Sequence, residues 1–271
     1  MKIKLKHGVS VGLLIACIAC IFIYVHVPNE AKSENNFGVP TVFVHGYKGT
    51  KNSFGSMLER FEDNGWGKKR FIYYVSSRGR LTDHYVNKEA SNQTFVQIIL
   101  RNNRASFSDS TEWLATVLRH LKDKYDIDTI NLVGHSMGGL ISMKYMMEYQ
   151  SNDFPKVHRF VAIGSPFDGI YSQKYFKINH DRAATDLKPH SLAFQLLHKG
   201  RIPREVEVLN IGSTGDPISI PKSVKAIRKM VHPSQLTEII VQNDKLGHSE
   251  LHESLQVDKM IHSFLWQDEG L

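Results

Sequence analysis

Gly134-His135-Ser136-Met137-Gly138-Gly139 is the stretch that decides the fold of this 271-residue chain. The apolar run Ile130-Asn131-Leu132-Val133 precedes it and a helical pattern follows, which predicts a strand, a sharp turn that carries a serine, and a helix. A serine hydroxyl is a poor nucleophile at neutral pH, so it must be displayed where a base can reach it. Gly134 and Gly138 suit the bend, because a Cβ at either position would collide with the returning chain. The motif therefore predicts nucleophilic acyl transfer; a plain glycine-rich turn is the alternative.

Apolar runs outside this motif predict the strands of one sheet. Most runs are continuous rather than alternating with polar residues, which is typical of a sheet covered on both faces. The predicted strands are Gly38–Val44, Phe71–Val75, Phe95–Leu100, Asp128–Val133, Val157–Ile163, Val206–Ile211 and Leu236–Val241. The predicted helices are Thr111–Tyr125 after a cap at Asp109 or Ser110, Leu140–Glu148, and Leu255–Trp266. This alternation predicts the α/β class, with a mostly parallel central sheet and helices on both faces.

Residues 38–271 are expected to form one domain, because a core of this size needs no covalent staples. The interval Gly169–Glu205 interrupts the alternation with mixed polar and aromatic residues and no clear strand pattern. An insertion at residues 170–205 is expected to form a cap over the site. A pair of ordinary connecting helices, which Ser191–His198 supports, is the alternative.

The first residues predict membrane anchoring. Lys2, Lys4 and Lys6 precede a mostly apolar run, Gly8–Val27. A helix over Val9–Val27 would be about 28 Å long, close to the hydrocarbon thickness of about 30 Å. We expect residues 1–27 to be an apolar signal-anchor helix and residues 28–37 a polar linker, with the domain outside the cell membrane on a single span. A form that is secreted after cleavage, or lipidated at Cys17, is the alternative.

Composition excludes several classes of site and partner. Cys17 and Cys20 are the only cysteines, so residues 38–271 have neither a disulfide framework nor a cysteine-based metal site. The net charge of +7 favours anionic surfaces such as lipid headgroups or acidic polymers. No stretch combines basic clustering with interleaved aromatic residues, which argues against nucleic-acid binding. The sequence does not indicate an oligomeric state.

A nucleophilic Ser136 requires a base, and the base requires an acid that fixes its tautomer. Asp216 follows the predicted strand Val206–Ile211, and His248 follows the last predicted strand, so both are expected at the carboxyl edge of the sheet. Asp168 is the alternative acid, because it also follows a strand, although one strand earlier. His252 is the alternative base, four residues beyond His248. We therefore predict Ser136 as nucleophile, Asp216 as acid and His248 as base.

The tetrahedral intermediate of acyl transfer needs donors for its oxyanion. Met137 is expected to offer its backbone N–H at the start of the helix, where donors are unpaired. Gly46 follows the first predicted strand and lets the backbone turn, so that the Tyr47 N–H is expected beside the Met137 N–H. A plain glycine turn is the alternative for this loop. His45 and His135 are predicted to be structural.

These features resemble a bacterial family of α/β hydrolases formerly catalogued as a domain of unknown function, with carboxylesterase-like members. The resemblance rests on the His45-Gly46 loop, the Gly134–Gly139 motif, the late Asp216, and the ending His248-Ser249-Glu250-Leu251-His252-Glu253 before the last helix. It implies the α/β-hydrolase fold over about residues 38–266 and the same roles for Ser136, Asp216 and His248. Asp216 is followed by Pro217, whereas the family pattern has glycine after the aspartate.

The leading hypothesis is a membrane-anchored serine hydrolase that cleaves carboxylic esters of small molecules or lipids. The predicted chemistry requires no metal and no organic cofactor. A lipase or lysophospholipase, or an acyltransferase, is the alternative within that chemistry. A hydrolase fold that serves as a non-catalytic binding module at the cell surface is the alternative from another class.

Overall fold

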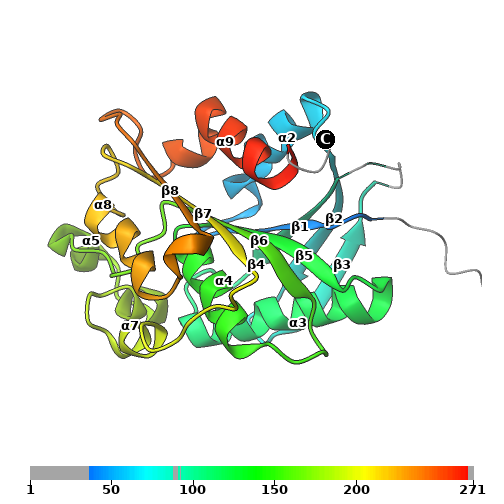
Figure 1. Cartoon of the computed structure of the whole chain (residues 1–271). Helices are drawn as coiled ribbons and strands as arrows, with labels where there is room; N and C mark the ends of the chain where they lie inside the picture. The colour runs from blue at the N-terminus through cyan, green and yellow to red at the C-terminus, as the bar shows by residue number, and fades with distance from the viewer. Residues whose placement is uncertain (1–36, 88–90, 92, 268–271) are drawn as a thin grey trace, which may run out of the picture. The chain divides into compact units, whose positions relative to one another are not determined.

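The computed structural model describes residues 37–87, 91 and 93–267, in which eight strands form one sheet in the order β3-β2-β4-β1-β5-β6-β7-β8 (Figure 1). Strands β2 and β3 pair antiparallel, and all other neighbouring pairs are parallel. The strands are β1 (Thr41–Val44), β2 (Lys68–Val75), β3 (Leu81–Tyr85), β4 (Thr94–Leu100), β5 (Thr129–His135), β6 (Lys156–Ile163), β7 (Glu207–Ser213) and β8 (Leu236–Val241). The predicted mostly parallel sheet is confirmed, and the fold is that of an α/β hydrolase.

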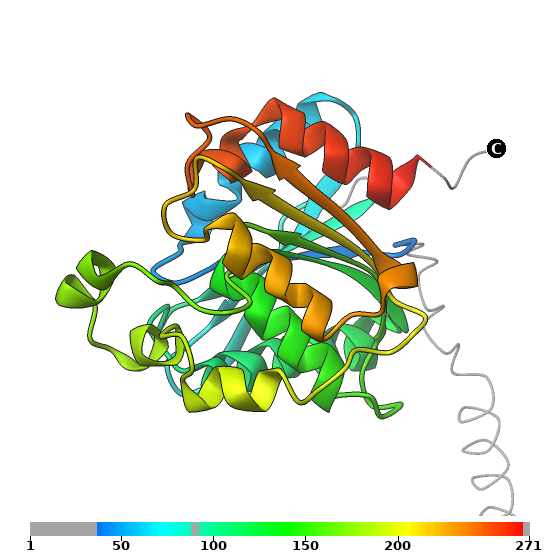
Figure 2. The ribbon, with the colours of Figure 1, turned by 60° about the vertical axis from the view of Figure 1, so that its left-hand side comes forward.

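Helices cover both faces of this sheet, as the sequence predicts. Helices α2 and α9 lie on one face, and α3 and α4 lie on the other, in both views (Figures 1 and 2). The α-helices are α2 (Gly55–Asp63), α3 (Phe107–Tyr125), α4 (Met137–Glu148), α5 (Gln173–Ile178), α6 (Arg182–Asp186), α7 (Leu192–Leu197), α8 (Pro221–Val224) and α9 (Leu255–Trp266). Four short 3₁₀ helices are η1 (Lys51–Ser53), η2 (Lys225–Lys229), η3 (Pro233–Gln235) and η4 (Glu250–Glu253).

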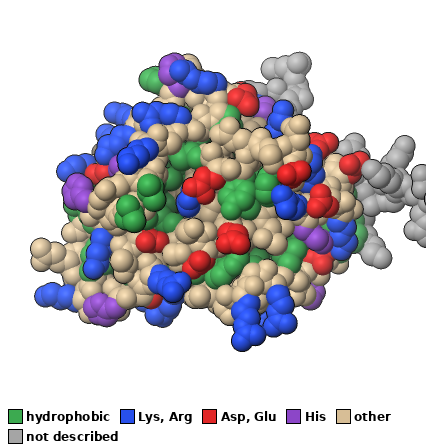
Figure 3. All heavy atoms as spheres, turned by 90° about the horizontal axis from the view of Figure 1, so that it is seen from below, with side chains coloured by type: hydrophobic (Ala, Val, Ile, Leu, Met, Phe, Trp, Pro, Cys, Tyr) green, Lys and Arg blue, Asp and Glu red, His purple; other side chains and the backbone are tan. Residues whose placement is uncertain are grey.

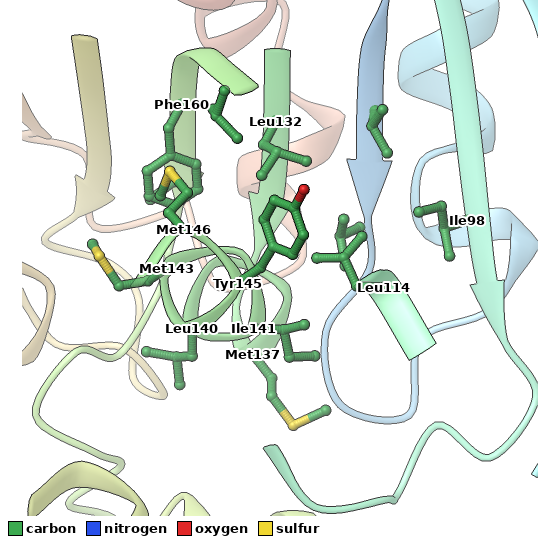
Figure 4. Packing of buried hydrophobic residues seen from close by; sticks show 14 of the residues in the cluster. Ile98, Leu114, Leu132, Met137, Leu140, Ile141, Met143, Tyr145, Met146 and Phe160 are labelled. Atoms are coloured by element: carbon green, nitrogen blue, oxygen red, sulfur yellow. The ribbon is translucent and has the colours of Figure 1, made fainter. Parts of the chain in front are cut away.

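Two hydrophobic clusters, one on each face, follow from the alternation of side chains along the strands. On β1, Phe43 joins the cluster beneath α2 and α9, whereas Val42 and Val44 join the cluster beneath α3 and α4. Helix α4 is apolar over most of its surface, and Figure 4 shows Tyr145 and Met146 on the side of Leu132 and Phe160, with Met137 and Leu140 on the opposite side of the helix. This packing fixes the start of α4 at the end of β5, which is the position of the predicted serine turn.

Strand register brings the carboxyl ends of the central strands level with one another. Val44 of β1 lies opposite Gly134 of β5, and His135 lies opposite Ile163 of β6. Ile163 in turn pairs with Ile211 of β7. The loops that follow these strands therefore open at the same edge of the sheet, which is where open α/β sheets place their sites.

Two helices begin earlier than predicted. Helix α3 begins at Phe107 rather than Thr111, because the Ser106 side chain caps it by accepting the Asp109 N–H at 3.1 Å. Helix α4 begins at Met137 rather than Leu140. Its first residues are held against the sheet although glycine has low helix propensity.

The interval 170–205 holds three short helices, α5, α6 and α7, rather than a pair. Each begins at a side-chain cap, supplied by Ser172, Asp181 and Ser191 respectively. The predicted signal anchor at residues 1–27 and nearly all of the linker at 28–37 lie outside the described residues. Within the part of the chain that the structure describes, no helix has the length and hydropathy required to cross a membrane.

Candidate active site

Ser136 lies in the turn between β5 and α4 with a φ of 56° and a ψ of −124°, a backbone conformation that residues with a side chain rarely adopt. The Ser136 N–H donates to the Ile163 carbonyl at 2.8 Å, which ties the turn to β6. A Cβ at Gly134 would lie 2.5 Å from the Gly139 nitrogen, and a Cβ at Gly138 would collide with the Val44 carbonyl. The predicted need for glycine at both positions is confirmed.

His248 contacts both of its predicted partners. Its Nε2 atom lies 2.9 Å from the Ser136 Oγ, and its Nδ1 atom lies 2.7 Å from the Asp216 Oδ2. Because a carboxylate only accepts, Nδ1 carries the proton and Nε2 accepts from the serine hydroxyl. Ser136 and Asp216 are both buried, so water competes little for this chain of hydrogen bonds.

The Asp216 carboxylate is fixed by its own loop. Its Oδ1 atom accepts the N–H groups of Ile218 and Ser219, each at 2.8 Å, which leaves Oδ2 for His248. Pro217 has no N–H and takes no part in this turn. Proline in place of the glycine that follows the aspartate in the family pattern therefore does not prevent Asp216 from contacting His248.

The structure does not bring the two alternative residues to Ser136. Asp168 accepts from the Tyr171 hydroxyl at 2.6 Å and from Lys229 Nζ at 2.8 Å. Burial alone would raise the pKa of Asp168, but the hydrogen bonds from Lys229 and Tyr171 outweigh it and hold that pKa below its ordinary value. His252 lies 3.2 Å from a Glu253 oxygen, and its ring centroid is 4.6 Å from that of His135.

The loop after β1 packs against the serine turn. A Cβ at Gly46 would lie 2.7 Å from the Ser136 Cβ and 3.2 Å from the Met137 nitrogen, so the two backbones are in close contact. Among the described residues, neither the Tyr47 N–H nor the Met137 N–H has a hydrogen-bond acceptor. Two free donors beside the serine are what an oxyanion would require.

Two buried histidines support the loops around Ser136. The Leu100 N–H donates to His45 Nε2 at 3.0 Å, and His45 Nδ1 lies 2.9 Å from the Gly46 carbonyl oxygen. His135 Nε2 donates to the His248 carbonyl at 3.0 Å, which links the serine turn to the loop that carries His248. Their contacts agree with the predicted structural roles, although no sequence pattern identifies the partners.

Acid is expected to destabilise the protein through its buried histidines. Burial lowers the pKa of His45, His135 and His252. Below about pH 6.5 the unfolded chain therefore binds more protons than the folded chain, and each such histidine removes up to about 1.4 kcal/mol of stability per pH unit. Urea unfolding at several pH values between about 7.5 and 5.5 measures this slope. His135→Gln should make the decline shallower, and an unchanged slope in that variant would contradict the assignment.

The helical segment at 170–205 contacts the loop after β1. The Tyr47 hydroxyl donates to Asp181 Oδ2 at 2.6 Å and also lies 3.1 Å from Asn179 Oδ1, to which Lys48 donates. Burial and the Asp181 carboxylate raise the pKa of Tyr47 above its ordinary value. These contacts join residues more than 130 positions apart in the sequence, and the sequence analysis misses them.

Within the described residues, no group of three or more His, Cys, Asp or Glu side chains is arranged to hold a metal ion. Two surface pockets lie away from Ser136. One, of about 400 Å³, lies between the end of α4 and the start of β6, and the other, of about 440 Å³, lies beside α7.

Comparison with known proteins places these features in a family. A family described as "Alpha/beta hydrolase of unknown function (DUF915)" matches residues 28–268. A search of curated proteins gives no match.

Solved structures share the fold. The lin2722 product from Listeria innocua is similar with a TM-score of 0.70 and 21% identity, over 84% of this chain and 94% of that one. A provisionally assigned cell surface hydrolase from Lactobacillus plantarum WCFS1 has a TM-score of 0.64 and 22% identity, over 85% and 91% of the two chains. The lipase BlEst2 from Bacillus licheniformis has a TM-score of 0.58 and 14% identity, over 84% and 92%. At these identities the likeness establishes the fold alone.

Proposed function

Because the chain belongs to the DUF915 family of alpha/beta hydrolases, we propose that it is a serine hydrolase that cleaves carboxylic esters with Ser136 as the nucleophile. One observation carries the proposal: His248 lies within hydrogen-bond distance of both Ser136 and Asp216. This is the arrangement in which an imidazole can take the serine proton while a carboxylate stabilises the resulting imidazolium.

The proposed reaction begins when Ser136 Oγ attacks the ester carbonyl carbon and its proton passes to His248 Nε2. The carbonyl oxygen becomes an oxyanion that accepts the Tyr47 and Met137 N–H groups. The intermediate then expels the alcohol, which receives the proton from His248, and an acyl group remains on Ser136. Water attacks this acyl group with His248 as base, and the carboxylic acid leaves with Ser136 restored.

The backbone of Ser136 supports an enzyme rather than a binding module on the same fold. A residue with a side chain at φ 56° costs about 1–3 kcal/mol, and such strain is concentrated at functional sites. A binding module would not need a serine displayed in this way. Similarity in fold to a lipase favours the ester class, with lipid esters and transfer to acceptors other than water as variants of the same chemistry.

A graded series of p-nitrophenyl esters tests the proposal. The full-length protein should hydrolyse at least the short-chain esters at neutral pH, with saturation kinetics, because the ester must bind at Ser136 before it reacts. A burst of p-nitrophenol is expected wherever hydrolysis of the acyl-enzyme is slower than its formation. The acyl length that gives the highest kcat/KM then identifies the preferred substrate class. A preparation that unfolds cooperatively yet hydrolyses no ester of the series would rule out this substrate class.

A further inference from the structure

Exposed apolar side chains gather on the segment 171–205, which contains α5, α6 and α7. Its large exposed hydrophobic residues are Tyr171, Ile178, Leu192 and Leu196, whereas the rest of the described chain exposes only Val86 and Leu255 to a similar degree. Ile178 is 74% exposed and Leu192 is 68% exposed, so neither contributes to the core. Several large apolar side chains exposed on one segment indicate an interaction site.

The same segment is strongly basic. It exposes seven cationic side chains, and its only exposed acid is Glu205; the seven are Lys174, Lys177, Arg182, Lys188, Lys199, Arg201 and Arg204. Asp109 of α3 lies 3.5 Å from Arg182 and offsets one of these charges. Asp181 and Asp186 are partly buried and accept from Tyr47 and from the Phe107 N–H. The left part of Figure 3 shows Lys and Arg side chains beside hydrophobic ones on the face seen from below. We call the exposed side chains of residues 171–205 the α5–α7 surface.

A pocket opens beside the apolar part of this surface. It has a volume of about 440 Å³, and Leu192 and Leu196 of α7 and Met147 of α4 form part of its lining, which also includes the polar residues Lys144, Glu148 and Asp186. The surface therefore has a hollow beside its exposed leucines, with apolar side chains in part of its wall.

We propose that the α5–α7 surface docks on a bilayer that contains anionic lipids. Exposed aliphatic side chains enter the boundary between headgroups and acyl chains, while Lys and Arg side chains remain among the anionic headgroups. A protein partner would also cover the leucines. Apart from Arg182, which pairs with Asp109, the segment exposes six cations against one acid, and this excess favours an anionic lipid surface instead.

Docking would bring a bilayer close to the candidate site, because Asn179 and Asp181 of this segment contact Tyr47. The proposal does not rest on ester hydrolysis, since binding to vesicles is measured without a substrate. Failure of either proposal therefore leaves the other intact.

Vesicle flotation with a matched pair of double variants tests the proposal. Lys174 and Ile178 are exposed and four residues apart at α5, and Leu255 and Lys259 are exposed and four residues apart at α9. The full-length protein should bind phosphatidylglycerol-containing vesicles at least tenfold more tightly than phosphatidylcholine vesicles, and added salt should weaken that binding. Lys174→Gln with Ile178→Ser should weaken it at least fivefold, whereas Leu255→Ser with Lys259→Gln should leave it unchanged. Equal effects of the two double variants, or no preference for anionic vesicles, would overturn the proposal.

Tryptophan probes distinguish docking by this surface from attachment through the N-terminal residues. Leu196→Trp and Leu255→Trp each place one probe at an exposed position on a common background of Trp66, Trp113 and Trp266. Anionic lipids with brominated acyl chains should quench the probe at position 196 more strongly than the probe at 255. Equal quenching would overturn the proposal. Sedimentation of the lipid-free protein tests whether a second copy of the chain covers this surface instead. A wild-type dimer that becomes a monomer in Leu192→Ser would also overturn the proposal.

Discussion

Replacing Ser136 by alanine is expected to lower kcat for ester hydrolysis by about a million-fold, as loss of the nucleophile does in other serine hydrolases. The substitution removes the Oγ atom that attacks the carbonyl and keeps the Cβ that packs against Gly46. The fold should therefore survive, with an unfolding midpoint in urea close to that of the wild type. Rates on p-nitrophenyl esters and urea unfolding of the same preparation measure the two effects.

Ser142→Ala is the matched control for that variant. Ser142 lies on α4 six residues after Ser136, is fully buried, and its hydroxyl has no hydrogen-bond partner within the described residues. Removal of the Ser142 hydroxyl should leave kcat within about twofold of the wild-type value. Ester hydrolysis that persists in Ser136→Ala would show that Ser136 is not the nucleophile. Loss of hydrolysis in Ser142→Ala would show that the effect of an alanine is not specific to position 136.

Replacing Asp216 by asparagine is expected to lower kcat by about 10⁴-fold, the effect of the same change in other serine hydrolases. The asparagine carbonyl would continue to accept the N–H groups of Ile218 and Ser219, so its NH₂ group would face His248 Nδ1. His248 would then carry its proton on Nε2 and could not accept one from Ser136. The measurement is kcat between pH 6 and pH 9 on the ester that the wild type prefers.

Asp168→Asn is the comparison for this change, because Asp168 is the other acid that follows a strand at this edge. Its carboxylate contacts Tyr171 and Lys229. We expect kcat to remain within about tenfold of the wild type. A large loss in Asp168→Asn together with a small loss in Asp216→Asn would reverse the assignment of the acid.

The proximity of Ser136, Asp216 and His248 could be predicted because parallel strands present their carboxyl ends at one edge. Once the strands around Ser136, Asp216 and His248 were predicted, the order of the loops limited which side chains could meet. The glycines at 134 and 138 added steric information that no other residue type provides. The distances between Ser136 and its partners also depend on the register of β5, β6 and β7. That register could not be predicted from the sequence.

Other parts of the structure left no signal of comparable strength. Strand β3 alternates partly buried and exposed residues at the sheet edge, so it has no continuous apolar run. Helix α2 buries only Met57, Leu58 and Phe61 and lies in a loop-rich interval. The contact of Tyr47 with Asp181 depends on two side chains far apart in the sequence, and a single sequence carries no pattern for such a pair.

The central claim is that Ser136 is activated by His248, and reaction with a fluorophosphonate followed by peptide mapping tests it most directly. The claim predicts one phosphonylated residue per chain, at Ser136, and a rate of labelling that falls at least a thousandfold in His248→Ala. A folded protein that stays unlabelled, or that is labelled at a different serine, would contradict it.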